Sequence, residues 1–308
     1  MPVDAGMAAT EPGTPPVRAR IWHTGEFGRR QPAMRRSHHP RGEELPINHL
    51  ATVGLHSSTR GRLLERLAAP PWWNPEMAET RLTPHPGKVA AWLVFVGALA
   101  LLSYGARLGA GDDTPRDAAY RFSSSVAALV QYGLMLGILL LIARGLPRRE
   151  AFALRRPPSW KRALGLAALA LLSIYVASFV YEQVLSLFGN WSPSDEQGLV
   201  PDRWESSRAA AFVAFFLVVT LVAPAIEELT FRGLGVSLLE PWGSALAILV
   251  TGILFGAAHG LIVALPILAF FGIALAWLRV RTNSVYPGML LHATFNGIAL
   301  IAAVSGAG

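Results

Sequence analysis

The chain has 308 residues, of which 52% are hydrophobic and only 15% are charged, and its mean hydropathy is +0.39. Soluble globular domains carry about 25% charged residues, so this composition indicates a membrane protein. The net charge of +7 comes without a stacking motif of interleaved basic residues, so no nucleic-acid partner is expected. Because cysteine is absent, the sequence also excludes disulfides, thiolate nucleophiles and cysteine-based zinc sites.

Residues 1–87 differ in composition from the rest of the chain. They are rich in Pro, Gly, Arg and His and show no sustained hydrophobic period. Such a segment buries too little apolar surface to offset its ordering entropy, so we expect a disordered N-terminal extension with short helical content around 60–68. No apolar core follows its basic residues, so it is not a signal peptide. A second interpretation is that translation begins at Met77 and that residues 1–76 are an upstream misreading of the gene.

From Val89 onward, apolar runs recur at the length that crosses a bilayer, about 17–25 residues. They predict an all-α polytopic bundle of about seven transmembrane helices in the cell membrane. No internal repeat is evident, which weighs against an inverted-repeat transporter. The predicted spans are 89–106, 124–143, 163–186, 209–226, 244–261, 264–279 and 285–304.

The charges of the connecting loops predict the orientation of the bundle. The loop 144–162 carries seven Lys and Arg residues against the single Glu150. Loops rich in Lys and Arg stay in the cytoplasm, so this loop and the N-terminus are expected there. The loops 107–123 and 187–208 are mixed or acidic and fit the opposite side. The residue usage, rich in Ala, Arg and Gly, looks bacterial, which indicates the inner membrane.

The fourth predicted span ends in the stretch 221-LVAPAIEELTFRG-233, which places two carboxylates in an apolar run. Pro224 lacks a backbone donor and should kink the helix. Glu228 and Arg232 stand four residues apart in the order that favours an ion pair. Glu227 points about 100° away from Glu228 and has no obvious partner on its helix, which suits a general base. A structural ion cluster at a helix end is the alternative.

Two histidines extend this group, because only His259 and His292 of the eight in the chain lie in predicted spans. They occur in 255-FGAAH-259 and 292-HATFN-296. Asn296 lies one turn after His292, where its amide could hold a ligand or donate to an oxyanion. Phe255, one turn before His259, is expected to pack rather than to react. A lone buried histidine is more often a core residue, but two of them beside an acid pair indicate a functional site.

A carboxylate, two imidazoles and an amide suffice to hydrolyse a peptide bond. Glu227 would take a proton from water, His259 would position that water or polarise the site, and His292 with Asn296 would stabilise the oxyanion. This mechanism requires no cofactor. The alternative is a divalent metal such as zinc, with Glu227, His259 and His292 as its ligands. The helix motif H-E-x-x-H of zinc proteases is absent.

The ordered motifs 227-EELTFR-232, 255-FGAAH-259 and 292-HATFN-296 resemble those of the CPBP family of intramembrane proteases. This family includes the type-two CAAX prenyl endopeptidases and the Abi-like proteins of bacteriocin processing or immunity. The resemblance covers about residues 209–304 and implies a catalytic transmembrane domain there, after variable helices in 88–208. It implies that Glu227 activates water and that Glu228, paired with Arg232, supports it. It also implies that His259, His292 and Asn296 complete the catalytic set.

The expected partners are therefore the lipid bilayer and a peptide or protein substrate with a membrane-presented segment, which is cleaved by an endopeptidase (peptide hydrolase) activity. The alternative of another class is a non-enzymatic membrane protein. It could be a proton-coupled transporter that uses Glu227 and the histidines as a relay, or a scaffold or immunity factor. The sequence does not give the oligomeric state or the substrate.

Overall fold

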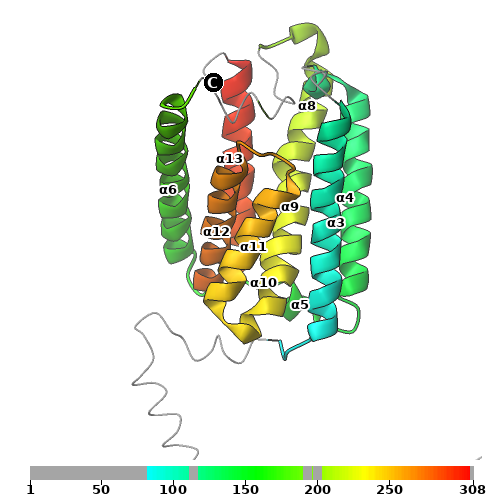
Figure 1. Cartoon of the computed structure of the whole chain (residues 1–308), viewed down its shortest axis with the longest axis vertical. Helices are drawn as coiled ribbons and strands as arrows, with labels where there is room; N and C mark the ends of the chain where they lie inside the picture. Colours follow the sequence, from blue (N-terminus) through cyan, green and yellow to red (C-terminus); the bar gives the residue numbers. More distant parts are fainter. Residues whose placement is uncertain (1–81, 111–116, 190–195, 197–202, 306–308) are drawn as a thin grey trace, which may run out of the picture. The chain divides into compact units, whose positions relative to one another are not determined.

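The computed structural model describes residues 82–110, 117–189, 196 and 203–305. The chain divides into two units, Met1–Ser57 and Ser58–Gly308, and all of the described residues belong to the second unit. The segment 1–81, with the predicted helical stretch at 60–68 and Met77, lies outside the described residues. The described part consists of helices and their connections (Figure 1), which confirms the predicted all-α class.

The helices alternate in direction along the chain. Three long helices come first, a continuous series of shorter helices follows, and three further helices joined by short connections complete the bundle. The long first three are α3 (Pro86–Ala110), α4 (Phe122–Ile142) and α6 (Trp160–Ser186). The others are α8 (Ala209–Leu217), η4 (Val218–Val222), α9 (Ala223–Glu228), η5 (Leu229–Gly235), α10 (Val236–Leu239), α11 (Ser244–Ala258), α12 (Leu265–Thr282) and α13 (Tyr286–Val304). Short turns of helix are η2 (Ala118–Tyr120), α5 (Arg148–Ala151), η3 (Ser206–Arg208) and η6 (Glu240–Trp242).

Six apolar helices in the described part are long enough to cross a membrane, and α11 is too short. Its 15 residues span about 22 Å, against about 30 Å of hydrocarbon. The prediction of a full-length span at 244–261 was therefore wrong. The helix ends at His259 because Gly260 adopts a positive φ of 66°. An apolar run conceals such an ending, since the turn after it is apolar too.

The fourth predicted span was also bounded wrongly. It does not end at 226 but continues as one helical segment of 37 residues, Ser206–Trp242. Its second half, from Phe231 to Leu239, is buried by neighbouring helices. The two adjacent glutamates consequently lie inside a long helix rather than at its end.

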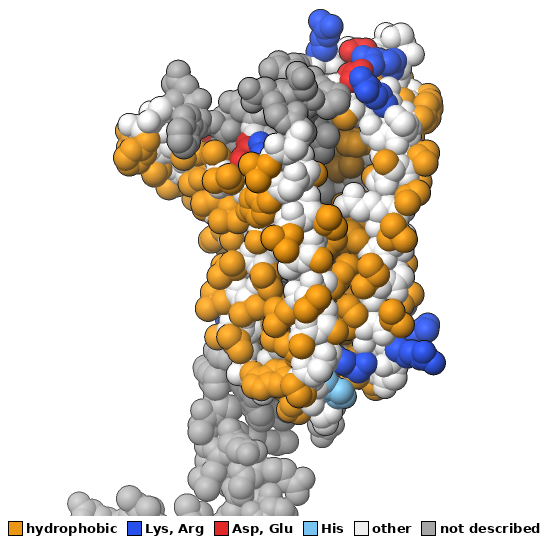
Figure 2. Space-filling model, turned by 45° about the vertical axis from the view of Figure 1, so that its right-hand side comes forward, with side chains coloured by type: hydrophobic (Ala, Val, Ile, Leu, Met, Phe, Trp, Pro, Cys, Tyr) orange, Lys and Arg blue, Asp and Glu red, His pale blue; other side chains and the backbone are white. Residues whose placement is uncertain are grey.

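The outer surface of the bundle is apolar. Large aliphatic and aromatic side chains of α3, α4 and α6 are exposed, among them Leu101, Leu141 and Phe179. Figure 2 shows hydrophobic side chains along the flank of the bundle, with Lys and Arg gathered toward its ends. A soluble monomer rarely exposes so continuous an apolar surface, whereas lipid tails cover it without cost. The chain is therefore a multi-pass membrane protein.

The helices α8 to α13 form the centre of the bundle, with α6 on one side and α3 and α4 on the other (Figure 1). The closest pair is α11 with α12, which pack through glycines. A Cβ on Gly272 would lie 2.5 Å from the carbonyl oxygen of Gly252. A Cβ on Gly256 would lie 2.8 Å from the backbone nitrogen of Ala269. Small residues allow this approach, which is a common way to join helices inside a membrane.

This packing predicts opposite effects of one substitution at two glycines. Gly272→Ala places a methyl group against backbone that cannot move aside, so we expect a loss of about 1–3 kcal/mol of stability. Gly133→Ala in α4 meets nothing within 4 Å and removes a flexible residue from a helix, so it should gain up to about 1 kcal/mol. Thermal unfolding of both variants in one detergent measures the difference. Equal effects would contradict the glycine contact.

Candidate active site

The helix that carries the acid pair contains two π-helical turns. The turn η4 (Val218–Val222) precedes the short helix α9 (Ala223–Glu228), and the turn η5 (Leu229–Gly235) follows it. π turns are rare and occur often at functional sites. They leave some backbone carbonyls to partners from outside the helix, and both turns here have such a partner.

The first π turn is explained by Pro224. The backbone N–H of Ala223 donates to the carbonyl of Val218, and Pro224 has no N–H to donate to the carbonyl of Val219. The side chain of Asn296 fills this gap, because its Nδ2 donates to the Val219 carbonyl at 3.0 Å. The expected effect of Pro224 thus takes the form of a π turn within a continuous helix. One hydrogen of the Asn296 amide is engaged with the backbone.

The second π turn is held by α3 and by the loop after α4. The indole Nε1 of Trp92, a fully buried side chain, donates to the carbonyl of Thr230 at 3.0 Å. Gly235 lies against the same indole, since a Cβ on it would come within 2.5 Å of the ring. A Cβ on Gly233 would lie 3.2 Å from the backbone of Phe152. The helix segment with Arg232 is therefore fixed by close contacts on two sides.

Glu228 and Arg232 form an ion pair that is closed to solvent. Their side chains are both 0% exposed, and Arg232 Nη1 lies 3.0 Å from Glu228 Oε1. Arg232 also donates from Nη2 to the carbonyl of Gly272 at 3.1 Å, and its guanidinium stands 4.3 Å above the ring of Phe255. An arginine over an aromatic face is held by the ring's quadrupole. The pair thus joins the long helix to α11 and α12.

His292 lies between the two glutamates. Its Nδ1 is 3.1 Å from Glu228 Oε1, and its Nε2 is 3.6 Å from Glu227 Oε2. Because Glu228 is ion-paired and only accepts, we assign the proton to Nδ1, which leaves the Nε2 lone pair facing Glu227. Gly288, one turn earlier on α13, makes room for the acid: a Cβ there would lie 2.7 Å from Glu228 Oε2.

Tyr132 completes the surroundings of Glu227, and sequence reasoning missed it. Its hydroxyl donates to Glu227 Oε1 at 2.7 Å, from α4. Glu227 is the more accessible of the two acids, with 13% of its side chain exposed. The one available signal was that Tyr132 is the only titratable residue of α4. No spacing connects it to a glutamate 95 residues later.

His259 lies apart from this group. It is exposed at the end of α11, where its Nδ1 donates to the carbonyl of Phe255 at 2.7 Å. The ring of Phe255 packs against both histidines, at 4.6 Å from the His259 centroid and 5.7 Å from that of His292. Among the described residues, His259 makes no hydrogen bond or ion pair with Glu227. Phe255 itself is buried, as expected for a packing residue.

The alternative metal site would consist of Glu227, His259 and His292. A catalytic zinc is held by about three converging protein ligands. The described residues contain no group of three or more His, Asp or Glu side chains placed to hold a metal. Glu227 and His292 are adjacent, but His259 is not placed with them. In this arrangement the side chains of the three residues do not converge as zinc ligands would.

Comparison with known proteins assigns the segment that carries this site. Residues 209–298 match the family model described as type II CAAX prenyl endopeptidase, Rce1-like. This segment is a domain of that family. It contains all three motifs that suggested the resemblance, and the family is one of peptide hydrolases. No curated protein and no solved structure matches the chain significantly. Tyr132 lies outside the endopeptidase domain.

The geometry predicts that the two neighbouring glutamates differ in their effect on stability. Glu228→Gln removes the anion beside a fully buried arginine, which costs about 3–5 kcal/mol when one partner of a buried pair is lost. Glu227→Gln leaves that pair intact and should change stability little. Thermal unfolding of the two purified variants measures this contrast, and equal melting temperatures would contradict the assigned roles.

Proposed function

We propose that the chain is an intramembrane endopeptidase in which Glu227 activates water to hydrolyse a peptide bond. The observation that carries the proposal is the position of the Glu227 carboxylate, between the Tyr132 hydroxyl and His292 Nε2. The family match supports the reaction class. The assignment of roles to individual side chains rests on this geometry.

The two oxygens of Glu227 have different roles in this mechanism. The Tyr132 hydroxyl occupies Oε1, so Oε2 is the oxygen that accepts a proton. A water bound beside Oε2 and His292 Nε2 donates its hydrogens to both. With its proton on Nδ1, His292 orients the water in this mechanism and does not donate to the oxyanion, the role first expected for it with Asn296. As Glu227 takes one proton, the water oxygen attacks the scissile carbonyl carbon. The carbon–nitrogen bond then breaks, and the amine leaves with the proton that Glu227 held.

The remaining polar groups are proposed to serve the substrate carbonyl. His259 donates from Nδ1, so the Nε2 of its neutral ring is an acceptor that could help to position the water. Asn296 keeps one amide hydrogen after its bond to Val219 and could donate it to the oxyanion. Both roles require the bound substrate to extend from Glu227 toward these side chains.

The depth of the site suggests how a substrate reaches it. His292 is six residues into α13, about 9 Å along the helix axis from its start. At that end the basic loop after α4 contacts the turn before α13, since Val285 N–H donates to the Ala153 carbonyl at 3.2 Å. If the basic loop is cytoplasmic, as the positive-inside rule favours, the site lies in the cytoplasmic half of the membrane. We therefore propose a membrane-anchored tail or segment, entering from that side, as the substrate.

The first test replaces the proposed base. Glu227→Gln should lower kcat by about 10²–10⁴-fold, because general-base catalysis contributes that much. The variant is assayed in proteoliposomes with a membrane-anchored tail as reporter, in prenylated and unprenylated forms. Unchanged cleavage by a variant that melts like the parent protein would refute the role of Glu227.

In the same assay, loss of the activity of the parent protein on chelation of metal ions would favour the metal-dependent alternative.

The second test concerns the orientation of the base. Tyr132→Phe removes a hydrogen bond to a carboxylate, which is worth about 1.5–3 kcal/mol, so we expect kcat to fall about 10–100-fold with KM nearly unchanged. Tyr181→Phe is the matched control, because its hydroxyl donates to the Val263 carbonyl in a different part of the bundle. A change in KM alone would contradict the proposed orienting role.

A further inference from the structure

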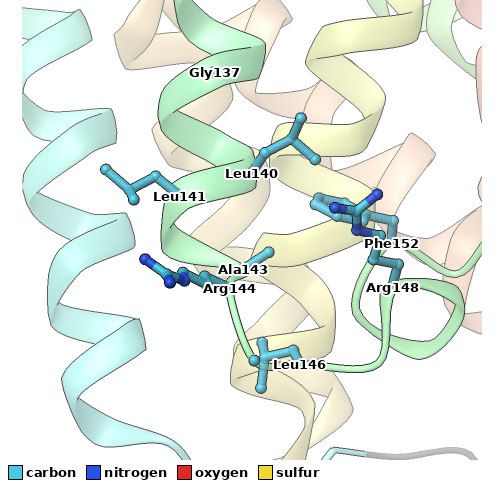
Figure 3. A pocket seen from close by; sticks show the side chains of 9 residues that line it. Gly137, Leu140, Leu141, Ala143, Arg144, Leu146, Arg148 and Phe152 are labelled. Atoms are coloured by element: carbon cyan, nitrogen blue, oxygen red, sulfur yellow. The ribbon is translucent and has the colours of Figure 1, made fainter.

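A pocket lies at the end of α4, apart from the glutamates. It has a volume of about 410 Å³ and is lined along α4 by apolar residues and at its rim by two arginines (Figure 3). Its lining includes Gly137, Leu140, Leu141, Arg144, Arg148 and Phe152. The catalytic mechanism involves none of them.

The apolar part of the pocket is on the lipid-facing surface. Leu140 is 41% and Leu141 66% exposed, and both belong to the membrane-spanning helix α4. At Gly137 and Gly145 a Cβ would meet nothing within 4 Å, so both glycines border open space. The pocket therefore opens where acyl chains lie against the helix, and its lower rim coincides with the end of that helix.

The rim carries positive charge that no carboxylate among the described residues neutralises. Arg144 and Arg148 are exposed, and neither forms an ion pair within that part of the chain. A third cation lies at the same end of α4, because Lys88 Nζ donates to the carbonyls of Ile142 and Arg144 at 2.9 and 2.8 Å. Two free guanidinium groups beside an apolar wall favour a ligand with an anionic head and an apolar tail.

We propose that this pocket binds an anionic phospholipid. Its phosphate pairs with Arg144 and Arg148, and the upper parts of its acyl chains lie over Gly137, Leu140 and Leu141. Arginine matches the geometry of a phosphate with its planar fork of donors. Basic clusters next to a membrane helix attract anionic lipids in this way. A soluble phosphate would use the rim alone and leave the apolar wall uncovered.

The bound lipid would touch both elements that position the catalytic glutamate. Phe152, which lines the pocket, packs with its backbone and ring 3.2–3.3 Å from the Cβ position of Gly233, next to Arg232. Gly137 is five residues after Tyr132 on the same helix. The lipid would therefore stabilise the packing of α4 and of the basic loop against the catalytic helix. This consequence rests on the proposed function, but lipid binding does not.

The test compares two double variants with the same change of charge. Arg144→Gln with Arg148→Gln removes the charge of the rim, whereas Arg149→Gln with Arg162→Gln removes two exposed arginines, in α5 and at the start of α6, that do not line the pocket. Binding of fluorescent phosphatidylglycerol is measured on the full chain in phosphatidylcholine nanodiscs. Each arginine near the membrane surface strengthens binding of an anionic lipid about fivefold, so we expect the rim variant, which lacks two, to bind about 30-fold more weakly. The control variant should bind like the parent protein.

Three results would overturn the proposal. Equal weakening of lipid binding in both variants would mean that binding depends only on the total charge at this end of the bundle. Equal binding of phosphatidylcholine would mean that the anionic head is not recognised. Competition by inorganic phosphate, at concentrations too low to screen charges at the nanodisc surface, would identify a simple anion site. Peptidase activity is not part of this measurement, so a failure here is distinct from a failure of the proposed function.

Discussion

The arrangement of the site depends on the buried ion pair between Glu228 and Arg232. A charge in the centre of a membrane protein is tolerated only with a partner, and this pair has no exposed surface at all. Each member then reaches one further element: Arg232 bonds the Gly272 carbonyl of α12, and Glu228 receives the Nδ1 of His292 from α13. The pair thereby fixes the histidine whose other nitrogen faces Glu227. Glu228 takes no part in the proposed reaction, but it positions the histidine that faces the proposed base, Glu227.

The sequence predicts this pair because its evidence is local. Spacing of four residues on one helix brings Glu228 to Arg232 whatever the rest of the fold does, and apolar runs of membrane length identify most of the spans. The ends of the helices were harder to predict from the sequence. The 15-residue α11 stops at a glycine turn that is itself apolar, and the acid pair lies inside a helix rather than at its end.

Most contacts between distant segments could not be predicted, although the motifs had already grouped His292 with Glu227. Tyr132 reaches Glu227 across 95 residues, and its helix lies outside the matched domain. Asn296 was expected to hold a ligand or donate to an oxyanion. One hydrogen of its amide instead bonds the Val219 carbonyl, which Pro224 leaves without a backbone donor. Such pairings depend on which helix faces are neighbours, which no periodicity in a single chain records. His259 was grouped with the others by its place in a predicted span and by the motif 255-FGAAH-259, and the structure leaves it at the exposed end of α11.

The two π turns have a consequence for how the catalytic helix tolerates changes in length. Each turn accommodates one residue more than an α-helical turn, and each residue of a helix rotates the chain by about 100°. Deleting one residue from η4 would allow that turn to become α-helical and would leave the segments on either side in nearly the same orientation. The change would remove the carbonyl arrangement that Asn296 now bonds at Val219. This helix has the composition of an ordinary apolar span, but its register is fixed by Asn296 at the first π turn and by Trp92 at the second.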